Sequence, residues 1–148
     1  MKAALIGAEL EENLGLRYMV SSLKQKGYQA SIFPFNDDSE IPAVVRQVMD
    51  FEPEIVGLSM VFTSRAREFC RMAKALRDGG FTGHLTAGGH FAALNCVQLM
   101  TDFREFDSIA LGEGEELICA LAESLPDLSE TAGFCWRGPD GRITVNRS

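Results

Sequence analysis

The stretch HLTAGGHF, residues 84–91, decides both the fold and the site that the sequence predicts. Its first six residues, HLTAGG, have the length and composition of a short buried strand, and they end in two consecutive glycines. Because a glycine has no Cβ atom, Gly88 and Gly89 make either a tight turn or a point where the backbone approaches a ligand closely. The stretch therefore predicts a strand whose carboxyl end has been cleared of side chains.

Four further apolar runs predict strands of similar length, and they are KAALIG (2–7), QASIFPF (29–35), EIVGLSM (54–60) and DSIALG (107–112). Helical periodicity fills the intervening and following segments, at residues 13–27, 39–51, 64–80, 91–103 and 113–125. Alternation of strands and helices predicts parallel strands joined by right-handed crossovers. We therefore expect an α/β, flavodoxin-like (Rossmann-like) fold, with a doubly wound parallel five-stranded sheet in the order 2-1-3-4-5.

The C-terminal residues depart from this alternation. GFCWRGPDGRITVN (133–146) has strand-like flanks around a Gly-Pro-Asp-Gly turn, which predicts a β-hairpin. The length of 148 residues suits one domain with one sizeable core. We expect a single domain over 1–148, with an α/β core at 1–130 and a closing hairpin at 131–148.

Composition limits the partners of the chain. The formal net charge of −7 argues against a nucleic-acid partner, because phosphates require a basic surface. No segment approaches the roughly 18 apolar residues of a membrane span. The N-terminal MKAALIGAELEEN lacks the apolar core and cleavage site of a signal peptide. We expect a cytoplasmic protein without a membrane partner.

The four cysteines are widely and irregularly spaced, and none forms a Cys-x-x-Cys pair. This spacing is typical of neither a zinc site nor an iron–sulfur cluster. We expect buried free thiols at Cys70, Cys96, Cys119 and Cys135.

Function is expected in the loops that follow the strands, because ligands of doubly wound sheets bind at the carboxyl edge. The first such loop, AELEENLGL (8–16), is acidic and would repel the phosphate that flavodoxins hold there. It also lacks the G-x-G-x-x-G of a dinucleotide site. The phospho-acceptor aspartate of a receiver domain is missing from LSMVFTS (58–64). Flavin, dinucleotide and phosphoryl-acceptor functions are therefore disfavoured.

The remaining loops carry small and polar residues. SMVFTS (59–64) places hydroxyls around a bulge at 60–62, and one of Thr63 and Ser64 is expected to cap the next helix. Ala87 and Ala110, on neighbouring strands, are small as well. Together with the glycine pair, they indicate a narrow slot at the edge of the sheet.

Two further positions are candidates for contact with a ligand. His90 is either a ligand contact or a loop and capping residue, whereas His84, at the other end of the same strand, is expected to be structural. In LGEGEE (111–116), Gly112 and Gly114 flank Glu113 at a helix start, where backbone N–H groups are free.

Together these elements resemble the cobalamin-binding domain at the N-terminus of cobalamin-dependent radical SAM enzymes. The resemblance covers nearly the whole chain. It is carried by ENLGLRYMVSSLKQKGY (12–28), PEIVGLSM (53–60), TAGGHF (86–91), DSIALGEGEE (107–116) and the closing hairpin GFCWRGPDGRITVN. It implies that the corrin ring lies across the carboxyl edge of the sheet, with its nucleotide tail in the slot.

The resemblance implies a set of cofactor-binding residues but neither a catalytic residue nor a metal ligand. These cofactor-binding residues are Leu14, Gly15, Ser59, Met60, Val61, Phe62, Thr63, Gly88, Gly89, His90, Phe91, Gly112, Glu113 and Gly114.

Two departures from related domains refine this expectation. Methionine synthase-type domains carry Asp-x-His-x-x-Gly after the first strand, but residues 8–16 contain no histidine. We therefore expect methylcobalamin or hydroxocobalamin bound with its base displaced and without a histidine ligand from this loop. The Cys-x-x-x-Cys-x-x-Cys motif of radical SAM enzymes is also absent.

The chain alone is therefore expected to be a methyl or corrinoid carrier rather than a catalyst. S-adenosylmethionine and an iron–sulfur cluster would belong to a catalytic barrel, in cis or in trans, and the chain is either a domain of such an enzyme or a stand-alone binding protein.

An alternative from another functional class is a cofactor-free interaction or sensory module on the same fold. In that case a basic helix face would contact an acidic partner through Arg65, Arg67, Arg71, Lys74 and Arg77. The slot distinguishes the two hypotheses, because an interaction module has no need for small residues at neighbouring strand ends.

Overall fold

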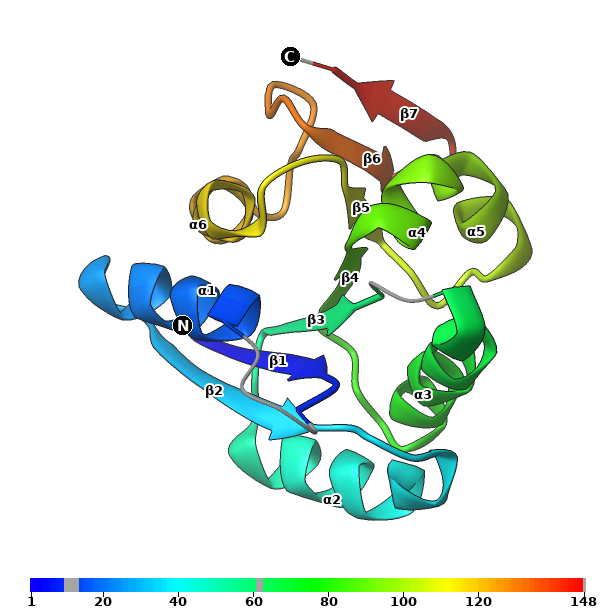
Figure 1. Ribbon diagram of the computed structural model, residues 1–148. Helices are drawn as coiled ribbons and strands as arrows, with labels where there is room; N and C mark the ends of the chain where they lie inside the picture. The colour runs from blue at the N-terminus through cyan, green and yellow to red at the C-terminus, as the bar shows by residue number, and fades with distance from the viewer. Residues whose placement is uncertain (10–13, 61–62, 148) are drawn as a thin grey trace.

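The structure, a computed structural model, describes residues 1–9, 14–60 and 63–147, without the side chains of Leu14 and Thr63. Within these residues a seven-stranded sheet carries helices on both faces (Figure 1). The parallel strands are β1 (Lys2–Gly7), β2 (Gln29–Pro34), β3 (Ile55–Ser59), β4 (His84–Gly88) and β5 (Ser108–Ala110). The antiparallel strands are β6 (Phe134–Arg137) and β7 (Ile143–Asn146).

The helices fall between the predicted strands. They are α1 (Leu14–Gln25), α2 (Ile41–Phe51), α3 (Ala66–Asp78), α4 (His90–Leu94), α5 (Cys96–Asp102) and α6 (Gly114–Ser124), with short 3-10 turns at Asp38–Glu40 and Thr63–Arg65. The helix expected at 91–103 is two short helices joined at Asn95, whose φ of −116° interrupts the helical backbone. No helix among the described residues is long and apolar enough to cross a membrane.

The strand order is β2-β1-β3-β4-β5-β6-β7, which confirms the predicted order of the five parallel strands. Pro34 ends β2 at the outer edge of the sheet, where a missing backbone N–H is tolerated. The predicted hairpin is also confirmed. Its first strand, β6, pairs antiparallel with β5 and extends the same sheet, with Ile109 opposite Cys135.

Two separate hydrophobic clusters lie on opposite faces of the sheet. Helices α2, α3, α4 and α5 cover one face, where Ile6, Leu58 and Met60 are buried. Helices α1 and α6 cover the other face, where Leu5 and Phe134 are buried (Figure 1). The separation follows from strand geometry, because successive side chains point to opposite faces.

All four cysteines are free and buried, as predicted. Burial raises the pKa of Cys70 to about 11 and that of Cys135 to about 12. These thiols are therefore protonated core side chains at neutral pH.

Candidate functional site

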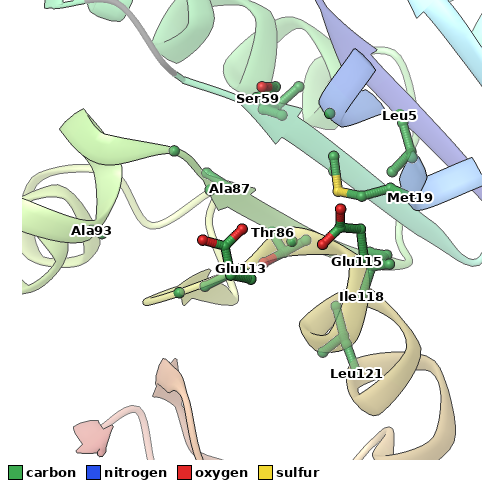
Figure 2. A pocket seen from close by; sticks show the side chains of 18 of the residues that line it. Leu5, Met19, Ser59, Thr86, Ala87, Ala93, Glu113, Glu115, Ile118 and Leu121 are labelled. Atoms are coloured by element: carbon green, nitrogen blue, oxygen red, sulfur yellow. The ribbon is translucent and has the colours of Figure 1, made fainter. Parts of the chain in front are cut away.

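A cavity of about 380 Å³ lies between the sheet, α1 and α6, and it reaches the carboxyl ends of β3, β4 and β5. Its walls are mainly apolar, with Leu16 and Met19 on α1. Ile118 and Leu121 of α6 line it from the other side, across from Met19 (Figure 2). Its volume lies near the lower end of the roughly 300–1,000 Å³ range of small-molecule sites. The cavity can therefore enclose one arm of a large ligand, but not a macrocycle.

The floor of the cavity is open because the sheet carries small side chains there. Gly57 and Ser59 of β3 lie in register with Thr86 and Gly88 of β4, and Ala110 of β5 lies beside Gly88. All five residues face α1 and α6. A floor of leucines or valines would fill the space that these five positions leave.

The two consecutive glycines have different roles. A Cβ atom at Gly88 would meet only the Cβ atom of Ala110, at an ordinary 3.7 Å, so that its absence leaves room rather than avoiding a clash. Gly89 has φ of +101° and ψ of 166°, a backbone region that is essentially restricted to glycine, and it precedes the first residue of α4. Gly89 therefore makes the turn, whereas Gly88 leaves space beside the sheet.

The cavity brings together many of the residues that the sequence predicts as ligand contacts. Those that line it are Gly15, Ser59, Gly88, Gly89, His90, Gly112, Glu113 and Gly114. Met60 and Phe91 do not line it. Met60 follows Ser59 and points to the opposite face, where it is fully buried, and Phe91 packs against the same cluster.

Four predicted positions are not tested by these contacts. Val61 and Phe62 lie outside the described residues, and the side chains of Leu14 and Thr63 are not described.

Sequence reasoning missed several lining residues, chiefly Gly57, Thr86 and the helix side chains Met19, Ile118 and Leu121. A glycine inside the apolar run IVGLS is itself a signal of close approach. Because alternate residues of a strand face the same side of the sheet, Thr86, two residues before Gly88, is expected on the same face. Ala87 also lines the cavity, as expected, although its side chain is buried in the cluster on the opposite face.

The start of α6 forms an acidic rim beside the cavity. Glu113 is exposed and Glu115 is partly buried, and the Glu113 side chain makes no capping hydrogen bond to the helix. Figure 2 shows both carboxylates projecting from the start of α6, with Met19 of α1 opposite Glu115. A Cβ atom at Gly114 would lie 2.7 Å from the Met19 sulfur. Gly114 therefore lets α1 and α6 approach each other at the wall of the cavity.

A buried polar chain lies on the same face of the sheet. Ser108 and Thr86 are 0% and 5% exposed, and the Ser108 hydroxyl donates to Thr86 Oγ1 at 2.8 Å. The Nε2 atom of His84 lies 2.8 Å from Ser108 Oγ. Burial lowers the pKa of His84 to about 4, against the opposing effect of Asp107. The structural role predicted for His84 is therefore supported by a specific contact.

The fold and the small-residue slot define a ligand-binding domain of the doubly wound α/β class. Comparison with known proteins makes this more specific, because residues 7–122 match the family model described as the B12 binding domain. The chain therefore belongs to the B12-binding domain family.

Two relatives illustrate the match. The chain is 26% identical over 153 residues to the cytidylyl-2-hydroxyethylphosphonate methyltransferase of Streptomyces wedmorensis, covering 89% of this chain and 28% of that protein. It resembles the solved apo, selenomethionine-labelled structure of the cobalamin-dependent S-adenosylmethionine radical enzyme OxsB, with a TM-score of 0.74 and 20% identity. That match covers 99% of this chain and 22% of the other chain, so that the chain spans about a quarter of either relative.

Proposed function

We propose that this chain binds cobalamin in the base-displaced form and serves as a methyl or corrinoid carrier domain for a radical SAM methyltransferase or a related enzyme. The observation that carries the proposal is the cavity on the α1 and α6 face, at the carboxyl edge of the sheet. The nucleotide tail would enter the cavity, and the corrin ring would lie across the rim.

The residues present fit such a cofactor. The floor at Gly88 is a cradle that a larger side chain would fill, and Leu5, Ile118 and Leu121 supply apolar contacts for a flat heteroaromatic base. Glu113 and Glu115 offer hydrogen-bond acceptors at the rim, where the amide arms of a corrin ring supply donors. The chain would thus bind the tail, orient the ring and exclude water from the buried base.

The expected absence of a histidine ligand from the first loop rests on the sequence of residues 8–16. The nearest imidazole at the cavity belongs to His90, which is exposed at the start of α4. When bound, cobalamin supplies the cobalt chemistry of methyl transfer. S-adenosylmethionine and an iron–sulfur cluster would belong to a catalytic domain in cis or in trans. The names of the two relatives, and the quarter of their length that this chain spans, support that arrangement.

The alternative of an interaction module loses part of its support, because partly buried intramolecular contacts hold Arg65 and Arg77 of the basic helix face. Arg65 pairs with Glu68 at 3.1 Å and lies over the rings of Phe35 and Phe69. The remaining ion pairs of this face are Arg71–Asp38, Lys74–Asp78 and Arg77–Asp107. Arg65 and Arg77 are therefore less available to an acidic partner than the sequence suggests, whereas Arg71 and Lys74 stay exposed.

Substitutions at Gly88 test the proposal. The protein is mixed with hydroxocobalamin, desalted and examined by absorption spectroscopy. Wild type should retain a corrinoid with a base-displaced spectrum. Gly88→Leu should weaken retention by about 10- to 100-fold, because overpacking of this size costs about 1–3 kcal/mol.

Gly88→Ala is the matched control, because its Cβ atom has an ordinary contact distance, and it should retain most of the cofactor. Thermal unfolding of all three proteins checks that the fold persists. A wild-type protein that stays colourless at high cofactor excess contradicts the proposal, as does a Gly88→Leu variant that binds as tightly as Gly88→Ala.

A further inference from the structure

The buried chain of His84, Ser108 and Thr86 connects the two ends of the sheet face. Thr86 lies on the floor of the cavity, whereas His84 lies at the amino end of β4 and borders a second hollow there. Ser108 of β5 lies in register with Thr86 and joins them. Among the described residues, Thr86 and Ser108 are the only buried hydroxyl-bearing or charged side chains, so that their polarity needs an explanation.

The donor-to-acceptor direction of the hydrogen bonds that link these three side chains follows from counting their protons. A serine hydroxyl has one proton, and Ser108 donates it to Thr86. The contact of His84 Nε2 with Ser108 Oγ is therefore a donation from an Nε2–H tautomer. Thr86 is the last donor of the chain, and its proton goes to the Ser108 carbonyl at 3.2 Å.

This last bond is the weakest of the three. O–H···O bonds are most often about 2.7–2.8 Å long, so that the 3.2 Å bond is easily exchanged for a better acceptor. Thr86 has its methyl group toward Gly57 and its hydroxyl toward Ser108, and it lies on the floor of a mainly apolar cavity that Ser59 of β3 also lines. A ligand that brings an unprotonated acceptor to the floor of the cavity would meet a hydroxyl ready to donate.

We infer that Thr86 determines specificity for the base of the corrinoid tail, by donating a hydrogen bond to an unprotonated ring nitrogen of that base. In this inference, which rests on the proposed function, His84 is a positioning residue that acts through Ser108. As the first donor of the chain, His84 keeps the Ser108 proton directed at Thr86 and so leaves the Thr86 proton available. Without a donor at residue 84, the Ser108 hydroxyl is free to rotate its proton away from Thr86. Thr86 then donates its own proton to Ser108 Oγ instead of to the ligand.

The test compares two corrinoids, cobalamin and cobinamide, which lacks the nucleotide and its base. Wild type should bind cobalamin more tightly than cobinamide. Thr86→Val, which keeps the shape but removes the hydroxyl, should weaken cobalamin binding by about tenfold and leave cobinamide binding within about twofold.

Variants of His84 separate positioning from packing. His84→Gln keeps an N–H donor near the Nε2 position and should retain the preference for cobalamin, whereas His84→Leu should lose about three- to tenfold of it. A purely structural role of His84 would lower the melting temperature of both variants without changing the ratio of the two affinities. Cobinamide binding serves as the check that each variant is folded.

The possible results distinguish the inference from the proposed function. Wild type that prefers cobalamin, with a Thr86→Val variant that keeps the full preference, overturns the inference and leaves the carrier function standing. Equal binding of both corrinoids by wild type also overturns the inference, because the base then has no contact of its own. Wild type that binds neither corrinoid overturns the proposed function, and the inference with it.

Discussion

At the residue scale, the two glycines at the end of β4 illustrate how one sequence feature can have two physical causes. Gly89 is favoured by its positive φ, whereas Gly88 leaves space above the sheet. The sequence alone could not assign these roles, because both depend on backbone angles and on neighbours from other strands. Gly88 is therefore the better position for a test of the slot. A leucine at Gly89 would strain the backbone as well as fill the slot, so that its effect could not be assigned to either cause.

His90 offers a test of the expected cobalt coordination. It is exposed at the rim of the cavity, and no axial ligation by it is expected. His90→Ala should leave the absorption spectrum of bound hydroxocobalamin unchanged and alter its affinity by less than about threefold. A shift of the spectrum on substitution, with wild-type protein as the reference, would identify His90 as an axial ligand and contradict the expectation.

His84 also predicts a pH dependence of stability. Burial lowers its folded-state pKa to about 4, below the ordinary 6.5, so that the unfolded chain binds more protons between these two values. The contribution of neutral His84 to stability is therefore fully present above about pH 6.5 and is lost as the pH falls toward 4. The full change is on the order of 3 kcal/mol.

Denaturant unfolding of wild type and His84→Gln at pH 7.5 and at pH 4.5 measures this contribution. The wild-type protein should lose more stability than the variant on acidification. Parallel loss in the two proteins would contradict the assignment of the low pKa to His84.

At the element scale, Arg77 fixes the C-terminal end of α3 to the loops around β4 and β5. Its guanidinium donates to the carbonyls of Phe81, Gly83 and Glu105, and it pairs with Asp107 at 2.8 Å. Arg77→Met should lower the free energy of unfolding by about 2–4 kcal/mol, because several partly buried acceptors lose their donor. Lys74→Met, one turn earlier, is the matched control and should cost less than about 1 kcal/mol, because the Lys74–Asp78 pair is exposed. Similar losses in both variants would show that the guanidinium network contributes little.

The same helix shows where sequence reasoning about elements succeeds and where it ends. Residues 64–80 have clear helical periodicity, and the structure has a helix at Ala66–Asp78. From the sequence alone, the basic face of this helix has no visible partners and therefore predicts a docking surface. Its partners Asp38, Glu105 and Asp107 lie some 30 residues away in the sequence, so that local patterns do not reveal them. Periodicity is a local property and predicts elements well, whereas the partners of a charged side chain depend on tertiary packing.

At the scale of the whole molecule, the order of the parallel strands was predictable because crossover rules leave few arrangements. The addition of β6 and β7 to the same sheet was not, since nothing local in residues 133–146 specifies that β6 pairs with β5. The cavity was only partly predictable. Its small residues are visible in the sequence, but its walls depend on how closely α1 and α6 approach the sheet.

The division of the interior into two hydrophobic clusters has a consequence for how such a domain can diverge. The larger cluster, on the α2 and α3 face, borders the cavity only through a few residues such as Leu58 and Ala87, whereas the α1 and α6 face supplies most of its walls. Mutations that adapt the chain to a different ligand can therefore accumulate on one side of the sheet, while the packing on the other side keeps the fold stable. Under the proposed function, such a domain can adapt to a different corrinoid tail without first acquiring compensating changes elsewhere.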